Sequence, residues 1–182
     1  MKKKLHMLID FKGYPLSKLQ KEMIQSAVSH TLDCLVSTRM KNTLEITITI
    51  EKDLYQDRQI WGDMMVDDDD RSPKLFDVRL NYSGVQSFGQ LLKVLCHELV
   101  HVCQFATRRM RHLSGSLRIG FGREHYTTSD IDYDNRPWEI EAHGLEDELF
   151  AYVREHDQRI EKYLQQKKCD SWRINESLAA RL

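Results

Sequence analysis

The chain has 182 residues, 41% hydrophobic and 30% charged, and its 27 basic and 28 acidic side chains give a formal net charge of −1. This length and composition exclude a disordered chain and predict one globular domain that needs no disulfide bonds to fold. The near-zero net charge excludes the strong positive field of a dedicated nucleic-acid-binding protein, although a local basic patch is compatible with it. We expect a single domain over residues 1–182, with its core at about 15–168 and a tail at 170–182.

The cysteines and the N-terminus predict a cytoplasmic protein. Four cysteines are irregularly spaced and form no CxxC pair, so neither a zinc ribbon nor a thioredoxin-type site is indicated. The apolar run after the N-terminal lysines is too short for a signal peptide and is interrupted by Asp10. No run approaches the length of a membrane span, and we expect no membrane partner.

The first half of the chain predicts one helix and three strands. Apolar residues at three- and four-residue steps indicate a helix over 15–40. Alternating, β-branched residues over 44–50 indicate a strand with one buried face. A weaker strand is expected over 60–66, an acidic turn over 67–73 and a third strand over 75–82.

The second half of the chain predicts two helices separated by an irregular region. A capping-box pattern begins a helix over 87–107. Residues 108–136 are irregular, with a short strand at about 117–121, and Pro137 begins a second helix that extends to about 168. These elements predict an α+β domain in which a small mixed sheet packs against both of these helices.

The segment Cys96 to Gln104 contains the pattern HExxH. Four residues advance a helix by about 400°, so His97 and His101 lie on one face, one turn apart. Two imidazoles so placed can bind one Zn²⁺. Glu98 lies beside them, placed to accept a proton from a metal-bound water. The competing interpretation is a buried helix with two hydrogen-bonded histidines and no metal.

A catalytic zinc needs a third protein ligand and an open position. Gln104 and Thr107 stand where the extended metzincin pattern would need glycine and histidine, so that variant is excluded. The candidates downstream are His112, His125, Glu139, Glu141 and His143. The segment that begins at Pro137 is the strongest of these, because it opens a helix, as the ligand-bearing segment of zincins with a glutamate ligand does.

The chain resembles the gluzincin metallopeptidases, in which HExxH is followed by a helix reading E-x-x-A. HELVHVxQFA together with Tyr133-Asp134-x-x-Pro-Trp-Glu-Ile-Glu-Ala142 is similar to small phage-encoded metallopeptidases described as SprT-like. The resemblance covers roughly residues 44–155. It implies a minimal zincin fold, one zinc ion and Glu139 as the third ligand. SprT proteins themselves use a third histidine, for which this chain has no clean counterpart, and His125 is the fallback ligand.

These residues predict a zinc-dependent peptidase. The expected cytoplasmic location is that of a bacterial host if the chain is phage-encoded, as the resemblance implies. Glu98 would act as general base toward a metal-activated water. The donor to the oxyanion stays open among Tyr126, Tyr133, His125 and His143. We expect residues 75–82 to form the sheet edge that pairs with an extended polypeptide substrate. Gln104, one turn beyond His101, either supports the ligands or is a polar residue of the cleft wall.

The sequence contains one acidic and one basic cluster. The run Asp67–Asp70 is predicted to be a solvated hairpin loop, because it lacks the spacing of a calcium loop. Arg108, Arg109, Arg111 and Arg118 either complement the end of the HExxH helix or contact phosphate. The phosphate interpretation leads to one alternative function, a DNA-associated SprT-like protease. The other is a non-catalytic structural or virion-assembly protein that binds zinc for folding.

Overall fold

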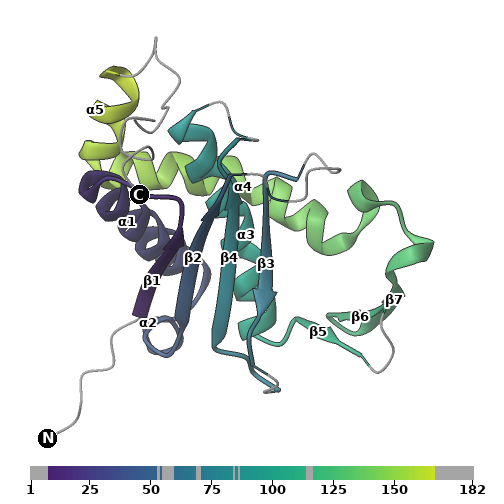
Figure 1. The fold of residues 1–182 in the computed structure, drawn as a ribbon. Helices are drawn as coiled ribbons and strands as arrows, with labels where there is room; N and C mark the ends of the chain where they lie inside the picture. The colour runs from purple at the N-terminus through teal and green to yellow at the C-terminus, as the bar shows by residue number, and fades with distance from the viewer. Residues whose placement is uncertain are drawn as a thin grey trace, which may run out of the picture.

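The computed structural model of the protein describes residues 8–52, 54, 60–68, 71–83, 85, 87–113 and 117–166. They form the predicted α+β fold, with helices packed on a larger sheet and a smaller sheet projecting from the body (Figure 1). In chain order the strands are β1 (Leu8–Gly13), β2 (Glu45–Glu51), β3 (Gly62–Val66), β4 (Leu75–Asn81), β5 (Met110–His112), β6 (Arg118–Phe121) and β7 (Glu124–Thr127). The α-helices are α1 (Lys18–Leu35), α2 (Thr38–Lys41), α3 (Phe88–Ala106), α4 (Pro137–His156) and α5 (Gln158–Gln166).

The larger sheet is mixed, as predicted, with strand order β1-β2-β4-β3. Strands β1, β2 and β4 are parallel, and β3 runs antiparallel to β4. The period-two pattern of β2 buries Ile46, Ile48 and Ile50 on the face that meets the helices. The predicted strands at 44–50, 60–66 and 75–82 are therefore confirmed.

The prediction that residues 75–82 form the sheet edge is wrong. Strand β4 pairs with β2 on one side and with β3 on the other, so its backbone groups are already used in two ladders. Instead, β3 is an edge strand of the described sheet, and it lies next to helix α3, which contains the HExxH motif. The order of strands in a sheet is set by long-range pairing, which alternation along a single strand does not reveal.

Strand β1 lies before residue 15, where the core was predicted to begin. It pairs with β2 in parallel, and Ile9 and Phe11 pack against the hydrophobic core. The core therefore includes this N-terminal segment, for which no strand was predicted. Residues 167–182, which contain the predicted tail, lie outside the described part of the chain.

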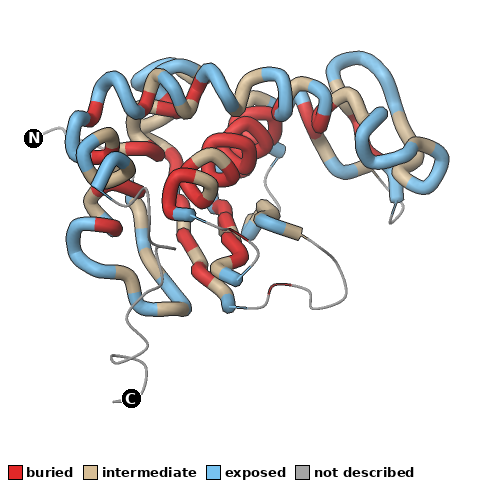
Figure 2. The backbone as a smooth tube through the Cα atoms, turned by 90° about the horizontal axis from the view of Figure 1, so that it is seen from above, coloured by how far each residue is buried: buried red, intermediate tan, exposed pale blue. Residues whose placement is uncertain are grey.

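Helix α3 occupies the centre of the molecule. It contacts β3 and β4 on one side and α1 and α4 on the others, and it is buried along most of its length (Figure 2). The predicted helix at 87–107 is confirmed, and Ser87 caps its start by accepting a hydrogen bond from the Gln90 amide. Because the sheet and two helices enclose α3, its polar side chains at positions 97–104 are held on a rigid support.

Two predicted helices are each divided into two. The helix expected over 15–40 ends at Leu35, and Ser37 caps the short helix α2 by accepting a hydrogen bond from the Met40 amide. The helix expected over 137–168 ends at His156, and Asp157 accepts hydrogen bonds from the Arg159 backbone and guanidinium. Serine and aspartate favour such breaks because their side chains bind free amides at a helix start.

The region predicted to be irregular, 108–136, contains the smaller sheet. The expected short strand at 117–121 is confirmed as β6, and β5 and β7 pair on either side of it, in antiparallel orientation. Both flanking strands are only three or four residues long. None of the described helices has both the length and the apolar character that crossing a lipid bilayer requires.

Candidate metal centre

Helix α3 brings the two histidines of the HExxH motif together. His97 and His101 are buried, and their Nε2 atoms lie 3.2 Å apart. The other faces of this turn carry the buried residues Leu99, Val100 and Val102, which anchor the helix in the core. The backbone therefore fixes both imidazoles on the face that looks toward α4.

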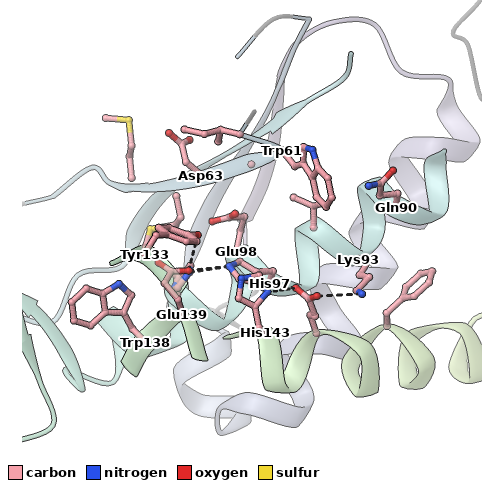
Figure 3. Close-up of a pocket in the computed structure, with 18 of the residues that line it drawn as sticks. Trp61, Asp63, Gln90, Lys93, His97, Glu98, Tyr133, Trp138, Glu139 and His143 are labelled. Carbon is pink, nitrogen blue, oxygen red and sulfur yellow. Dashed lines mark hydrogen bonds and ion pairs between the residues drawn. The ribbon is translucent and has the colours of Figure 1, made fainter. Parts of the chain in front are cut away.

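Glu139 completes a triangle with these histidines from the first turn of α4. Its Oε2 atom lies 3.3 Å from His97 Nε2 and 3.2 Å from His101 Nε2 (Figure 3). Pro137 occupies the start of this helix, where its missing N–H costs nothing, and buried Trp138 anchors the turn. Ala142 is fully buried one turn further along, which lets α4 approach α3 closely.

The triangle has the dimensions of a tetrahedral zinc site. Ligands at about 2.0–2.1 Å from a tetrahedral ion are spaced about 3.3–3.4 Å from one another, and the three edges here measure 3.2–3.3 Å. Among the described residues, two groups of three such side chains bring their ligand atoms within 4.8 Å of one another. One is His97, His101 and Glu139, and the other is His97, His143 and Glu146.

The charges around the three side chains of the triangle favour a positive charge among them. Burial lowers the pKa of His101, but the hydrogen bond with Glu139 and the charge of Glu98 raise that pKa to about 9. Burial raises the pKa of Glu139, yet hydrogen bonds with His101 and His97 hold it well below its usual value. An anionic carboxylate between two imidazoles is a donor set that suits a divalent zinc ion.

The fallback ligand His125 and two other candidates for the third ligand lie outside the triangle. His125 is exposed on β7, where its ring contacts the Arg111 guanidinium at 3.3 Å. His112, exposed on β5, lies against Phe105, with ring centroids 5.0 Å apart. Glu141 binds Arg109 at 2.7 Å instead of joining the triangle.

Glu98 lies beside the triangle and lines the cleft above it (Figure 3). Burial raises the pKa of its carboxyl group to about 7, while the charges of His101 and His97 oppose the rise. Within the described part of the chain, no protein group donates a hydrogen bond to this carboxylate. Its oxygens are therefore available to a water molecule in the cleft.

Gly62, which was not among the predicted site residues, allows β3 to pass directly over Glu98. A Cβ atom at this position would lie 2.7 Å from Val94 Cγ1 and 3.0 Å from Glu98 Oε1. Only glycine lets the strand approach this closely. The available signal was a glycine at the start of a strand pattern, which often marks a close backbone approach.

The outward-facing nitrogens of the two histidines also have partners. His101 Nδ1 lies 2.8 Å from Gln104 Oε1, and Gln104 in turn donates a hydrogen bond to the Trp138 carbonyl at 3.1 Å. Gln104 therefore contacts a candidate ligand and is more than a polar residue of the cleft wall. His97 Nδ1 lies 3.0 Å from Glu146 Oε2, a contact that was not predicted.

Of the four candidate oxyanion donors, Tyr133 lies against the triangle. Its hydroxyl donates a hydrogen bond to Glu139 Oε2 at 2.7 Å, and 51% of the residue is exposed. Tyr126 instead packs on Trp138, with ring centroids 5.8 Å apart. His143 lies beside His97, but on the side of Glu146.

The triangle opens into a cleft with a volume of about 1540 Å³. The cleft runs along α3 from Phe88 to Phe105, past both histidines, and β3 forms its opposite wall. Figure 3 shows Trp61 and Asp63 on one side of this space and His97, Glu139 and Tyr133 on the other. A ligand in the cleft can therefore extend to both sides of the triangle.

The arginine cluster contributes to local structure. Arg109 binds Glu141, and Arg111 donates a hydrogen bond to the Gly122 carbonyl at 3.0 Å. Arg108 and Arg118 are exposed. Contact of this cluster with phosphate stays a prediction.

Comparisons of the chain with protein-family models, with curated proteins and with solved structures find no match. The chemistry of the site is therefore inferred from its own residues.

Proposed function

We propose that the protein is a zinc-dependent metallopeptidase that hydrolyses peptide bonds. The observation that supports this most strongly is the buried triangle of His97, His101 and Glu139 beside the carboxylate of Glu98, which lines the cleft. Three protein ligands and an open side are typical of catalytic zinc, whereas structural zinc is enclosed by four. The resemblance of HELVH and the Glu139 helix to gluzincins supports the same function.

The side chains have separate roles in this reaction. Bound zinc would supply a Lewis acid that polarises the peptide carbonyl and lowers the pKa of water. Glu98 accepts the proton of the attacking water and returns it to the leaving amine. Its burial suits this exchange, because burial raises the pKa of the carboxyl group and so makes it a stronger proton acceptor.

An extended polypeptide is the substrate that fits the cleft. Strand β3 is the edge of the described sheet on this side and forms a wall of the cleft. An edge strand can bind an extended chain through backbone hydrogen bonds. We therefore propose β3, rather than residues 75–82, as the strand that aligns the substrate over Glu98.

Tyr133 is the proposed donor to the oxyanion. Tyr133→Phe loaded with one zinc per chain is expected to show a kcat lower by about 100-fold or more, as the loss of an oxyanion donor does in other hydrolases, with little change in KM. Full loading is needed because the Tyr133 hydroxyl also contacts the proposed ligand atom Glu139 Oε2. Steady-state kinetics and elemental analysis measure these quantities. Tyr126→Phe is the matched control, because its ring packs on Trp138 away from the triangle. An unchanged kcat in Tyr133→Phe would exclude this role.

Metal removal tests the proposed function directly. Chelation is expected to abolish cleavage of internally quenched peptides, and one equivalent of Zn²⁺ is expected to restore it, because the triangle alone would activate neither water nor carbonyl. Chelator that has been saturated with zinc beforehand serves as the control. Equal cleavage by the metal-free protein would contradict the proposal.

A further inference from the structure

Helix α4 presents a second carboxylate to the candidate metal centre. Glu146 follows Glu139 by seven residues, two helical turns, so both side chains face α3. Glu139 lies at the Nε2 side of His97, and Glu146 lies at the Nδ1 side, 3.0 Å away. The His97 ring is thus held between two carboxylates of the same helix.

Lys93 holds Glu146 in place. It precedes His97 by one turn on α3, and its Nζ atom lies 3.2 Å from Glu146 Oε1. The same ammonium lies 2.9 Å from Asp147 Oδ1. The Glu146 side chain is only 17% exposed, so its interactions with Lys93 and His97 are partly shielded from water. One oxygen of Glu146 is bound to Lys93, and the other is directed at His97.

The two histidines therefore differ in the side chains that contact their Nδ1 atoms. His101 has the neutral amide of Gln104 at its Nδ1 atom, whereas His97 has a charged carboxylate. A carboxylate that accepts the Nδ1 proton fixes the tautomer of a histidine and makes its other nitrogen a stronger ligand.

Glu146, His97 and His143 could instead hold a second ion. Two features disfavour that arrangement. His97 would have to bind metal through both nitrogens, and the Lys93 ammonium, 3.2 Å from the same carboxylate, would repel a cation. A hydrogen bond from His97 to Glu146 meets neither obstacle.

We infer that Glu146 is a positioning residue that orients His97 and strengthens its binding of zinc, and that Lys93 holds Glu146 in the required geometry. This inference rests on the proposed zinc centre. It concerns affinity for the metal rather than the chemistry of cleavage.

The test is the affinity of Glu146→Gln for zinc, measured by competition with a chromophoric chelator. We expect the Kd for zinc to rise by about 10- to 100-fold, the range typical when a residue that hydrogen-bonds to a metal ligand is removed. Glu146→Ala should lose at least as much. Asp147→Asn is the matched control: it removes the neighbouring carboxylate that also binds Lys93 but has no contact with His97, so its Kd should stay close to wild type.

The visible absorption of the Co²⁺-substituted protein provides a second readout, because it reports ligand geometry. We expect this spectrum to change in Glu146→Gln and not in Asp147→Asn, and circular dichroism of the metal-free variants verifies that they fold. Wild-type affinity together with a wild-type Co²⁺ spectrum in Glu146→Gln and Glu146→Ala would overturn the inference. So would two equivalents of metal in the wild type that fall to one in His143→Ala.

These results are separate from the fate of the proposed function. If the wild type binds one zinc and cleaves no peptide, the peptidase proposal fails while the effect of Glu146 on affinity is still measured. If the wild type binds no zinc, both are wrong.

Discussion

Glu98→Gln is expected to abolish peptide cleavage while leaving one zinc bound per chain. The amide has nearly the same shape as the carboxylate but cannot accept a proton, and the loss of a general base typically costs about 10²- to 10⁴-fold in rate. Zinc binding should persist because Glu98 lies beside the triangle of ligand atoms and is not part of it. Cleavage of a quenched peptide and elemental analysis on the same preparation measure both effects.

The matched control for this variant is Glu148→Gln. Glu148 is also a glutamate and lies on α4, but it is exposed and does not line the cleft. Activity close to wild type is expected for the control. Full activity in Glu98→Gln would mean that another group activates the water. If no variant or wild-type preparation cleaves any peptide, and zinc removal unfolds the chain, the structural zinc protein becomes the better interpretation.

The local parts of the site could be predicted from the sequence. The spacing of His97 and His101 depends only on helical geometry, and the structure brings them together as that geometry requires. Pro137 marks the start of α4, and with it the turn that bears Glu139. In both cases a few neighbouring residues determine the outcome.

The parts that depend on long-range packing could not be predicted. Glu146 reaches His97 only because α3 and α4 pack side by side, and Gly62 is required only because β3 crosses α3 at Glu98. The same limit explains the error over residues 75–82, whose place in the sheet depends on where β3 pairs. Strand β1 was not predicted because its six residues include one acidic and one basic side chain, which weaken the alternating apolar pattern. Its pairing with β2, which the sequence does not reveal, is needed to identify it.

The identity of the third ligand is the prediction that most directly tests this arrangement. Glu139→Ala is expected to weaken zinc binding by more than about 100-fold. Loss of a residue that only hydrogen-bonds to a ligand costs up to about 100-fold, and here the ligand itself is removed. The protein should then be isolated with little zinc. His125→Ala should retain one zinc per chain, since His125 lies exposed on β7 against Arg111.

Elemental analysis of the wild type, Glu139→Ala and His125→Ala, purified in parallel, measures this difference. Circular dichroism of each protein is the control for folding, because Glu139 also accepts the hydrogen bond of Tyr133 and lies against both histidines. Zinc retained by Glu139→Ala and lost from His125→Ala would reverse the assignment. It would also require the smaller sheet to move toward α3, since β7 now holds His125 away from the two buried imidazoles. The opposite result, with zinc lost only from Glu139→Ala, would show that α4 supplies the third ligand.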